Sequence, residues 1–549
     1  MRHGGKLLVE CLEVLGAKHG FGVPGESYLT VLDGMYQSGM TFVNCRNEGG
    51  AGFMAAAYGK LTGQPGLCFV TRGPGATNAS IGVHTAMQDS APMILFVGQI
   101  DTRTREREVF QEVDYRAFFG GMAKWATEIE HVERIPEVIS RAWAVALSGR
   151  PGPVVVALPE NVIGAATEVS PLSRAPSLPV PEASPEIVAK VREALGKARR
   201  PVILAGGGGW SDEGCRALEQ FAEVSDLPVV MAFRYQDRYD NALSTFVGEA
   251  GVGMLPQVRE TLAGADLILA MNVRFGEMTT DNYALFDLPD MAQTLIHTHL
   301  SSDELGKIYQ PDIAVQSCPN AFAGALAAAP VSGNWSDWRA EARARYEATF
   351  TLPDQPGPVN MVEVMEYLAD RLDEDAILTN GAGNFSIWNN KYFRYCRDQR
   401  LLAPQSGAMG YGLPAAVMAK IVHPDRQVVC FAGDGDFQMN GQELGAAMQM
   451  GAAPVVLVLN NQSYGTIRMH QEKHFPNRVS GTVLQNPDFA GIAKAYGMHG
   501  ERVETTAGFA PAFERALASS TGAVLEIPIA TEALTPRMTM ADLHASTKT

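Results

Sequence analysis

The pattern of apolar and polar positions divides the chain into two kinds of segment, short apolar runs and longer helical stretches, which alternate along the sequence. The runs are rich in Val, Ile and Leu and are bounded by Gly, Pro or polar residues, which is typical of buried strands. They lie at residues 41–45, 67–70, 93–97, 154–157, 202–205, 229–231, 267–270, 294–296, 376–378, 428–432, 455–459 and 523–527. Strands that alternate with helices form parallel sheets with helices on both faces. The pattern therefore predicts an α/β protein with three consecutive doubly wound parallel-sheet domains.

Two of the helical stretches differ in composition. Residues 6–10 (KLLVE) predict the start of an amphipathic helix, and their apolar run is too short for a signal peptide. Residues 49–61 predict a helix of small residues directly after the first strand. No apolar run reaches the roughly 18 residues of a membrane-spanning helix, so we expect no membrane partner.

Two proline-rich stretches without clear periodicity, residues 165–185 and 329–358, are typical of surface linkers. They divide the chain into domains that we expect at residues 1–165, 186–330 and 355–535. A chain of 549 residues is long enough for three domains of ordinary size.

The charge and the cysteines limit the possible partners and the compartment. The formal net charge is −16, and the chain has no basic run that would attract nucleic acid or an anionic membrane. The seven cysteines are scattered and form no C-x-x-C pair, which argues against both a disulfide framework and a zinc site. We therefore expect no nucleic-acid partner and a reducing, cytoplasmic location.

The most informative segments are residues 433–437 (GDGDF) and residues 460–461 (NN). They follow the expected strands 428–432 and 455–459, and a helix is expected between them at about 440–450. Polar groups at the carboxyl ends of parallel strands meet at one edge of the sheet, where α/β proteins bind ligands. Carboxylate, amide and carbonyl oxygens suit Mg²⁺ held together with phosphate oxygens. A lone GDG is more often a simple turn, but the spacing favours a site for Mg²⁺ and a diphosphate.

A GDG segment followed after about two dozen residues by NN resembles the diphosphate–Mg²⁺ motif of the thiamine-diphosphate-dependent decarboxylase and acetolactate (acetohydroxyacid) synthase superfamily. The resemblance covers essentially the whole chain. It implies an N-terminal pyrimidine-binding domain, a central Rossmann-like domain and a C-terminal diphosphate domain, with thiamine diphosphate and Mg²⁺ as cofactors. The implied metal ligands are Asp434, Asn461 and the backbone carbonyl of Ser463. The implied cofactor contacts in the same domain are Asn384, Gly433, Gly435, Asp436, Phe437 and Tyr464.

Residues 407–416 (GAMGYGLPAA) resemble the family segment that holds the aminopyrimidine ring through backbone groups. The resemblance implies that Gly407 supplies a carbonyl, that Met409 supplies an amide N–H, and that the Met409 side chain bends the cofactor. The alternative is a methionine that fills core space. The motif at 433–437 makes this alternative the less favoured one.

Glu48, just after the expected strand 41–45, resembles the family glutamate that hydrogen-bonds the pyrimidine ring. Proton transfer there activates the cofactor, and a buried carboxyl with a raised pKa suits this task. The alternative is a first-turn glutamate that complements the helix dipole.

Three further residues are weaker candidates for contact with the substrate. Glu26 lies in a segment that resembles the family's first active-site loop; it is either a proton donor or an ordinary exposed carboxylate. Gln111 resembles a glutamine on the thiazolium side, with a surface amide as the alternative. His470 falls close to a channel-lining position, with a structural histidine as the alternative.

The central domain departs from the synthases of the family. Those bind FAD in this domain and use an arginine for the second substrate, whereas Met278 stands at the arginine position and Thr298-His299 follow the next strand in place of an acid. Residues 206–209 (GGGG) are compatible with a dinucleotide cradle or with a simple strand–helix turn. These departures weaken the expectation of FAD, which stays an open possibility.

We therefore expect a thiamine-diphosphate-dependent lyase or carboligase (transferase) that breaks or forms a C–C bond next to the carbonyl of a 2-keto acid or related acyl donor. Aldehydes or ketones would be the acceptors, and decarboxylation, carboligation and hydrolysis are all compatible with the motifs. The alternatives are a flavin-linked 2-keto acid oxidase, a 1,2-dicarbonyl hydrolase and a non-catalytic regulatory protein. The resemblance also implies a homodimer or homotetramer with active sites at subunit interfaces.

Overall fold

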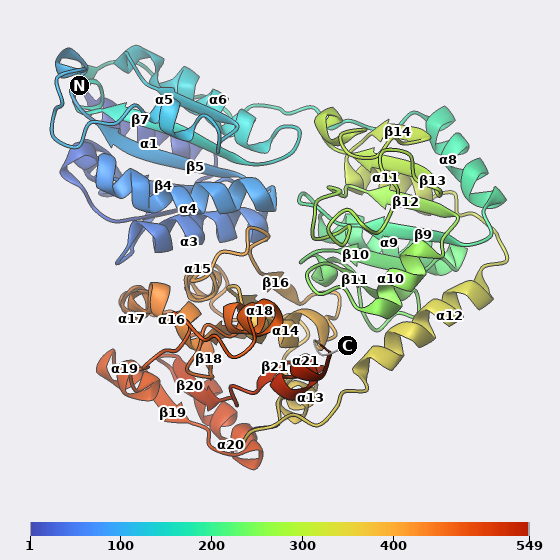
Figure 1. Cartoon of the computed structure of the whole chain (residues 1–549). Helices are drawn as coiled ribbons and strands as arrows, with labels where there is room; N and C mark the ends of the chain where they lie inside the picture. Colours follow the sequence, from blue (N-terminus) through green and yellow to red (C-terminus); the bar gives the residue numbers. More distant parts are fainter. Residues whose placement is uncertain (1, 547–549) are drawn as a thin grey trace. The chain divides into compact units, whose positions relative to one another are not determined.

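Three six-stranded sheets with helices packed on them confirm the predicted α/β class (Figure 1). The computed structural model describes residues 2–546. The chain divides into two compact units, each described by itself below. One contains the first sheet and most of the third; it comprises the chain up to residue 178 with residues 379–386 and 402–531. The other contains the middle sheet and comprises residues 179–378, 387–401 and the chain from residue 532 onward.

The first sheet has the strand order β3-β2-β4-β5-β7-β6, and its pairings are parallel. Its strands are β2 (His19–Gly22), β3 (Thr41–Asn44), β4 (Gly66–Val70), β5 (Met93–Gln99), β6 (Trp125–Glu128) and β7 (Pro153–Pro159). The helices around it are α1 (Gly4–Val14), α2 (Leu29–Met35), α3 (Glu48–Thr62), α4 (Gly73–Asp89), α5 (Tyr115–Phe119), α6 (Ile135–Leu147) and α7 (Glu160–Ile163). The amphipathic α1 and the small-residue α3 are as predicted. Small residues allow α3 and α4 to pack closely, since a Cβ on Gly82 would lie 2.5 Å from the Gly52 backbone.

The middle sheet has the order β11-β10-β9-β12-β13-β14 and is parallel throughout. Its strands are β9 (Pro201–Ala205), β10 (Val229–Ala232), β11 (Phe246–Ala250), β12 (Leu267–Met271), β13 (Thr294–His299) and β14 (Ile313–Gln316). Its helices are α8 (Pro185–Lys197), α9 (Asp212–Ser225), α10 (Pro256–Ala263), α11 (Pro319–Ala327) and α12 (Ser336–Glu347). Helix α12 lies inside the stretch 329–358, which the composition alone predicted to be a linker. Trp338, Ala342 and Tyr346 of α12 are buried and join the core around this sheet, which explains why the stretch is folded.

The third sheet has the order β16-β15-β17-β18-β20-β19, with parallel pairing along β17, β18, β20 and β19. Its strands are β15 (Ile377–Asn380), β16 (Arg400–Leu402), β17 (Val428–Gly433), β18 (Val455–Asn460), β19 (His499–Arg502) and β20 (Ala523–Pro528). Its helices are α13 (Met361–Arg371), α14 (Ile387–Lys391), α15 (Gly412–Val422), α16 (Asp434–Asn440), α17 (Leu444–Met450), α18 (Gly465–His474), α19 (Phe489–Ala495) and α20 (Thr506–Leu517). The helix predicted at about 440–450 is present in part, as α17, which ends at Met450 as predicted but starts later. A separate helix, α16, starts inside the GDG motif and ends at Asn440, where the backbone leaves the helical range (φ −139°).

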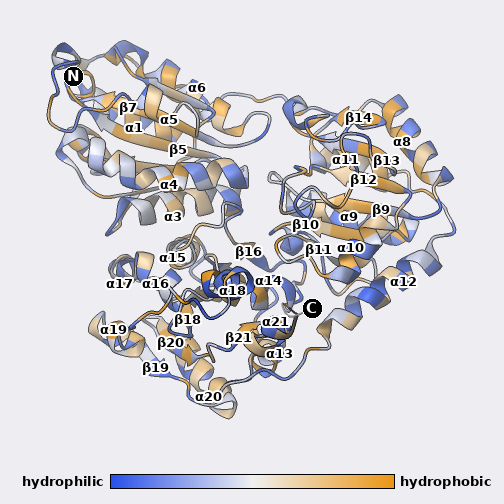
Figure 2. Ribbon diagram, in the orientation of Figure 1, coloured by the Kyte–Doolittle hydropathy of each residue, from blue (hydrophilic) through white to orange (hydrophobic). Residues whose placement is uncertain are grey.

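The core of each domain is its sheet, and Figure 2 shows apolar strands between helices with mixed surfaces. The central strands, such as β5, β9 and β18, are buried along their whole length. This is expected when helices cover both faces of a parallel sheet. Among residues 2–546, no helix combines the length and apolarity needed to cross a membrane.

Candidate active site

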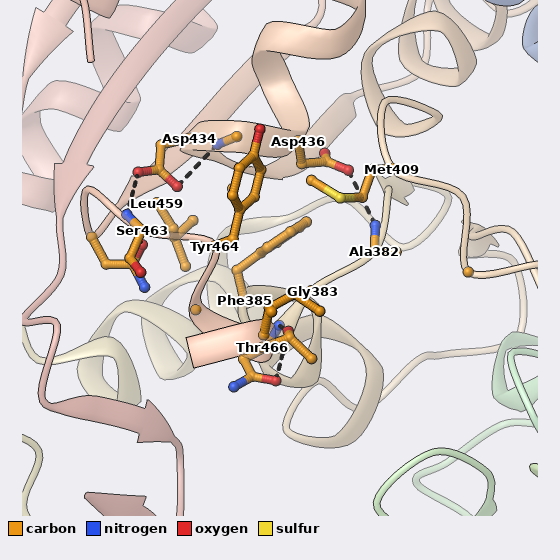
Figure 3. Close-up of a pocket in the computed structure, with 17 residues that line it drawn as sticks. Ala382, Gly383, Phe385, Met409, Asp434, Asp436, Leu459, Ser463, Tyr464 and Thr466 are labelled. Carbon is orange, nitrogen blue, oxygen red and sulfur yellow. Dashed lines mark hydrogen bonds between the residues drawn. The ribbon is translucent and has the colours of Figure 1, made fainter. Parts of the chain in front are cut away.

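A cavity of about 230 Å³ lies where strands β15, β17 and β18 of the third sheet end (Figure 3). Four segments of the chain line it: the turn after β15, the loop before α15, the end of β17 with the start of α16, and the end of β18 with the start of α18. The lining residues are Ala382, Gly383, Asn384, Phe385, Gly407, Met409, Gly433, Asp434, Gly435, Asp436, Leu459, Asn461, Ser463, Tyr464, Gly465, Thr466 and Ile467. Ten of the residues predicted from the sequence are therefore brought together at the predicted edge of the sheet.

Asp434 places a buried carboxylate on this cavity, with 3% of the residue exposed. Its Oδ1 accepts a hydrogen bond from Gly435 N (3.0 Å), and its Oδ2 accepts from Ser463 N (3.2 Å) and Asn486 Nδ2 (2.7 Å). Burial raises the pKa of Asp434, and these hydrogen bonds oppose that rise. Within residues 2–546 its partners are neutral donors without a cation. A buried carboxylate without counter-charge is costly, so a cation in the cavity would offset its charge.

The remaining donors near Asp434 restrict the kind of cation. Among the described residues, no group of three or more His, Cys, Asp or Glu side chains could hold a metal ion. A metal here would rest on one carboxylate and neutral oxygens. Such a set fits Mg²⁺, which binds few protein ligands and takes phosphate oxygens and water in its other positions.

The two residues of the NN pair have different surroundings. Asn461 lines the cavity, and its Oδ1 accepts from Ser463 N (3.1 Å). Asn460 is buried; its Oδ1 accepts from Asn486 Nδ2 (2.9 Å) and its Nδ2 donates to Glu526 Oε1 (2.9 Å). Asn486 therefore joins the two motifs. Sequence reasoning missed it, because no spacing rule singles out a residue in the loop that follows α18.

Asp436 connects three of the four lining segments through one oxygen. Its Oδ1 accepts hydrogen bonds from Ala382 N (3.1 Å) and Gly410 N (2.8 Å) (Figure 3 shows the first). A Cβ on residue 381 would lie 1.9 Å from this oxygen, so the close approach requires Gly381. The carboxylate of Asp436 thus fixes the shape of the cavity.

Two aromatic rings explain the glycines of the GDG motif. A Cβ on Gly433 would lie 2.7 Å from the Phe385 ring, and one on Gly435 would lie 2.5 Å from the Tyr464 ring. Both rings stand among the cavity residues in Figure 3. Glycine is therefore required on either side of Asp434 by close packing in this chain.

A polar pair and a glycine turn complete the cavity wall. Asn384 N and Asn384 Oδ1 both lie 2.9 Å from Thr466 Oγ1, so the turn after β15 is tied to the start of α18. Gly407 has a φ of +66°, which favours glycine, and it leads to Met409. Thr466 was not predicted from the sequence, because its role depends on which loops meet.

Glu48 is the first residue of α3, in the N-terminal domain. Asn47 caps the helix by accepting from Gly49 N (2.8 Å), and Glu48 Oε2 accepts from Asn78 Nδ2 of α4 (2.9 Å). Glu48 is half-buried, less than expected, because its helix end lies at the edge of the domain. It does not line the cavity of its own chain.

Comparison with known proteins covers all three domains. Residues 2–118 match the family model for the thiamine pyrophosphate enzyme N-terminal TPP-binding domain, residues 188–326 match the central domain, and residues 381–527 match the C-terminal TPP-binding domain. The acetolactate synthase isozyme 2 large subunit of Escherichia coli is 30% identical over 91% of each chain. The acetolactate synthase large subunit of Lactococcus lactis is 31% identical over 90% of this chain and 87% of that protein.

The chain belongs to the thiamine pyrophosphate enzyme family. Its cavity lies within the C-terminal TPP-binding domain of that family, and Glu48 lies within the N-terminal one. The resemblance to the acetolactate synthase branch, inferred from the motifs, is confirmed. A catalytic subunit from Saccharomyces cerevisiae mitochondria, also an acetolactate synthase, is 30% identical over 91% of this chain and 77% of that protein.

In the N-terminal TPP-binding domain, Glu26 and Gln111 both accept hydrogen bonds from residues at the start of α4. Arg72 Nη2 donates to Glu26 Oε1 (2.8 Å), although 77% of the Glu26 side chain is exposed. The Gln111 carbonyl accepts from Gly73 N (3.1 Å), and Gln111 has a φ of +65°. No sequence motif predicts Arg72, yet its side chain holds Glu26, and the N–H of the next residue, Gly73, holds the Gln111 carbonyl.

Two predicted residues of the C-terminal TPP-binding domain lie outside the cavity lining. Phe437 is buried, and its ring meets the Phe489 ring edge-on with centroids 5.5 Å apart. His470 is exposed on α18 and stacks on His474. The structure thus gives Phe437 a packing role, and it gives His470 a position on the surface.

The glycine-rich loop of the central domain accepts hydrogen bonds from a side chain of the same domain. Asn272 Nδ2 donates to the carbonyls of Gly206 (3.2 Å) and Gly208 (2.8 Å). Helix α9, which follows the loop, carries Asp212 and Glu213 in its first turn. Acidic side chains at a helix N-terminus oppose the binding of a diphosphate there, which adds a physical argument against FAD at this loop.

Proposed function

We propose that this thiamine pyrophosphate enzyme is a Mg²⁺-dependent lyase or carboligase that breaks or forms a C–C bond next to the carbonyl of a 2-keto acid or related acyl donor. The observation that carries the proposal is the buried Asp434 carboxylate, which faces a cavity and has neutral donors as its partners among the described residues. The names of the acetolactate synthase relatives support a keto acid as donor. Met278 stands where the family resemblance implies an arginine for the second substrate, which makes a different acceptor the expectation.

Asp434, the Asn461 side-chain oxygen and the Ser463 carbonyl would hold Mg²⁺, because they meet on one wall of the cavity. Two further sets of residues would hold the organic cofactor. The diphosphate contacts would be Asn384, Gly433, Gly435 and Tyr464, and the pyrimidine contacts would be the Gly407 carbonyl and the Met409 amide.

When bound, thiamine diphosphate supplies the electron sink for the bond that breaks. The chain's own task is to orient it and to move a proton. Asn78 occupies Oε2 of Glu48, so Oε1 is the oxygen that would hold the proton toward the pyrimidine ring. The bulk of Met409 would set the bend of the cofactor.

We infer that each active site is assembled from two copies of the chain, as a homodimer or homotetramer, and that the enzyme is cytoplasmic. Support for the first inference comes from Glu48, which does not line the cavity of its own chain. A second copy could bring its Glu48 to that cavity.

The test is turnover of a panel of 2-keto acids, acyloins and 1,2-diketones with thiamine diphosphate and Mg²⁺, in which CO₂ release is scored separately from C–C products. Glu48→Gln keeps the shape of the side chain but loses its proton, so turnover should fall about 10²–10⁴-fold while cofactor affinity is kept. Wild-type turnover in Glu48→Gln would contradict the proposal. Oxygen consumption together with a flavin spectrum would favour the oxidase alternative instead.

A further inference from the structure

A second buried carboxyl group, that of Glu443, contacts the turn that leads into Glu48. Glu443 belongs to the C-terminal TPP-binding domain, directly before α17, and it is fully buried. Its Oε1 accepts hydrogen bonds from Arg46 N (3.0 Å) and Asn47 N (3.0 Å), and its Oε2 lies 3.3 Å from Arg46 N. Two successive backbone amides of the N-terminal domain therefore converge on one side chain of the C-terminal domain.

These two amides determine how α3 begins. Asn47 is the N-cap of α3 and Glu48 is its first residue, so the peptide planes at 46 and 47 set the direction in which the Glu48 side chain leaves the backbone. Gly50 provides the space for the contact, because a Cβ there would lie 2.8 Å from Glu443 Oε1. Glu443 thus fixes the backbone of the turn through two amides, and none of these hydrogen bonds involves the carboxyl group of Glu48.

An acid suits this place better than an amide. Both oxygens of a carboxylate accept hydrogen bonds, whereas a glutamine would place an NH₂ donor on one of the two positions near Arg46 N. The Arg46 guanidinium is fixed on α17 by bonds from Nη2 to the Gly445 carbonyl (3.0 Å) and to Gln449 Oε1 (2.8 Å). Burial raises the pKa of Glu443 to about 7, with the Arg46 and Asn47 amides and the Arg46 charge opposing the rise.

We propose that Glu443 is a positioning residue for Glu48: by accepting hydrogen bonds from the amides of Arg46 and Asn47, it fixes the turn that aims the catalytic carboxyl at the cofactor. The proposal deepens the proposed function, since it rests on the proton-transfer role of Glu48. It assigns Glu443 no contact with substrate or cofactor.

The experiment compares Glu443→Ala, Glu443→Gln and Gly50→Ala with the wild-type enzyme loaded with thiamine diphosphate and Mg²⁺. The readouts are the exchange rate of the cofactor C2 proton in deuterated buffer, kcat, KM, cofactor affinity and melting temperature. Gly50→Ala displaces the Glu443 carboxyl from the other side, although alanine favours a helix more than glycine does. Its loss of activity would therefore not follow from a less stable helix.

Glu219→Gln is the matched control. Glu219 is also a buried carboxyl that accepts from a backbone amide, Asp240 N (3.0 Å), but it belongs to the middle domain. The Glu219→Gln variant should have a lower melting temperature than the wild type and the same exchange rate of the cofactor C2 proton.

We expect Glu443→Ala and Gly50→Ala to lower C2 exchange and kcat together by about 10- to 100-fold, as for a small misplacement of a catalytic group, with KM and cofactor affinity nearly unchanged. Glu443→Gln should fall between them and the wild type. Wild-type exchange in a folded Glu443→Ala or Gly50→Ala, or a loss matched by lost cofactor binding, would overturn the proposal. If Glu443→Ala does not fold, Glu443→Gln and Gly50→Ala decide it. If Glu48→Gln keeps full activity, the proposed function fails instead.

Discussion

Asn78 Nδ2 lies 2.9 Å from Glu48 Oε2, so a neutral donor on α4 holds one oxygen of the carboxyl that begins α3. The two helices pack closely through small residues, which fixes the distance between the two side chains. An amide donor restricts the rotation of the carboxyl and adds no charge beside it.

Asn78→Asp should lower kcat, because it removes the hydrogen bond that holds Glu48 Oε2 and places a second carboxylate about 3 Å from it. The loss should be about 10-fold or more, as for a misplaced catalytic group, and steady-state kinetics measure it. Ser80→Ala on the same helix is the control, since Ser80 is half-buried and its hydroxyl donates to the Thr77 carbonyl and not to Glu48. Wild-type kcat in a folded Asn78→Asp would show that this hydrogen bond does not position Glu48.

Asp434→Asn should abolish Mg²⁺-dependent binding of thiamine diphosphate, because it removes the one anionic group of the expected ligand set. The cofactor-free protein should melt at the same temperature or higher, since the change removes a buried charge without a cationic partner among the described residues. Calorimetric titration and thermal melting measure both effects. Asp488→Asn, an exposed helix cap in the same domain, should keep full affinity. Unchanged affinity in Asp434→Asn would refute the metal assignment.

Mixing two inactive variants tests whether each site is shared between copies of the chain. In a mixed dimer of Glu48→Gln and Asp434→Asn, one site would carry both changes and the other would carry neither. Random exchange of equal amounts should therefore restore up to about a quarter of the wild-type activity. The control is a mixture of Glu48→Gln with Glu48→Ala, which should stay inactive. Sites built within one chain would give no recovery in either mixture.

The stability of the wild-type protein should depend on pH through Glu443. Its folded pKa of about 7 lies above the ordinary value of 4.5, so the folded state binds this proton more tightly than the unfolded state does. The Glu443 contribution to the free energy of unfolding should therefore decrease as the pH rises from about 4.5 to about 7, and then stay constant.

Glu443→Gln removes this dependence. The free energy of unfolding of Glu443→Gln minus that of the wild type should therefore be more positive at pH 8 than at pH 5. The change is at most a few kcal/mol, on the order of the pKa shift converted to free energy. Urea denaturation of the cofactor-free protein at several pH values measures it. The same difference in stability at every pH would contradict the assigned protonation.

The sequence predicted the central strands but not most edge strands. All twelve apolar runs are strands in the structure, because central strands covered on both faces are continuous in Val, Ile and Leu. Six strands of the three six-stranded sheets were missed, and five of them, β6, β11, β14, β16 and β19, lie at sheet edges. For example, β19 reads His-Gly-Glu-Arg and is partly exposed, so it lacks the apolar signal. The sixth, β2, lies inside its sheet and was missed because two of its four residues are glycine.

The site was predictable where the chemistry resides in one continuous motif. Asp434, Asn461 and Ser463 lie on one cavity because two neighbouring parallel strands end there. Asn486 and Glu443 were not predictable in the same way. Their contacts depend on which loops and domains meet, and neither the spacing nor the composition of a single segment carries that information.

The shared oxygen of Asp436 has a consequence for engineering. The loop that carries Met409 is the natural place to reshape the active site, yet the N–H of Gly410 must reach the same Oδ1 that also holds Ala382 N. A grafted loop of different length would compete with the turn after β15 for that acceptor. Libraries that vary side chains at fixed loop length should therefore yield folded enzymes far more often than libraries of insertions and deletions.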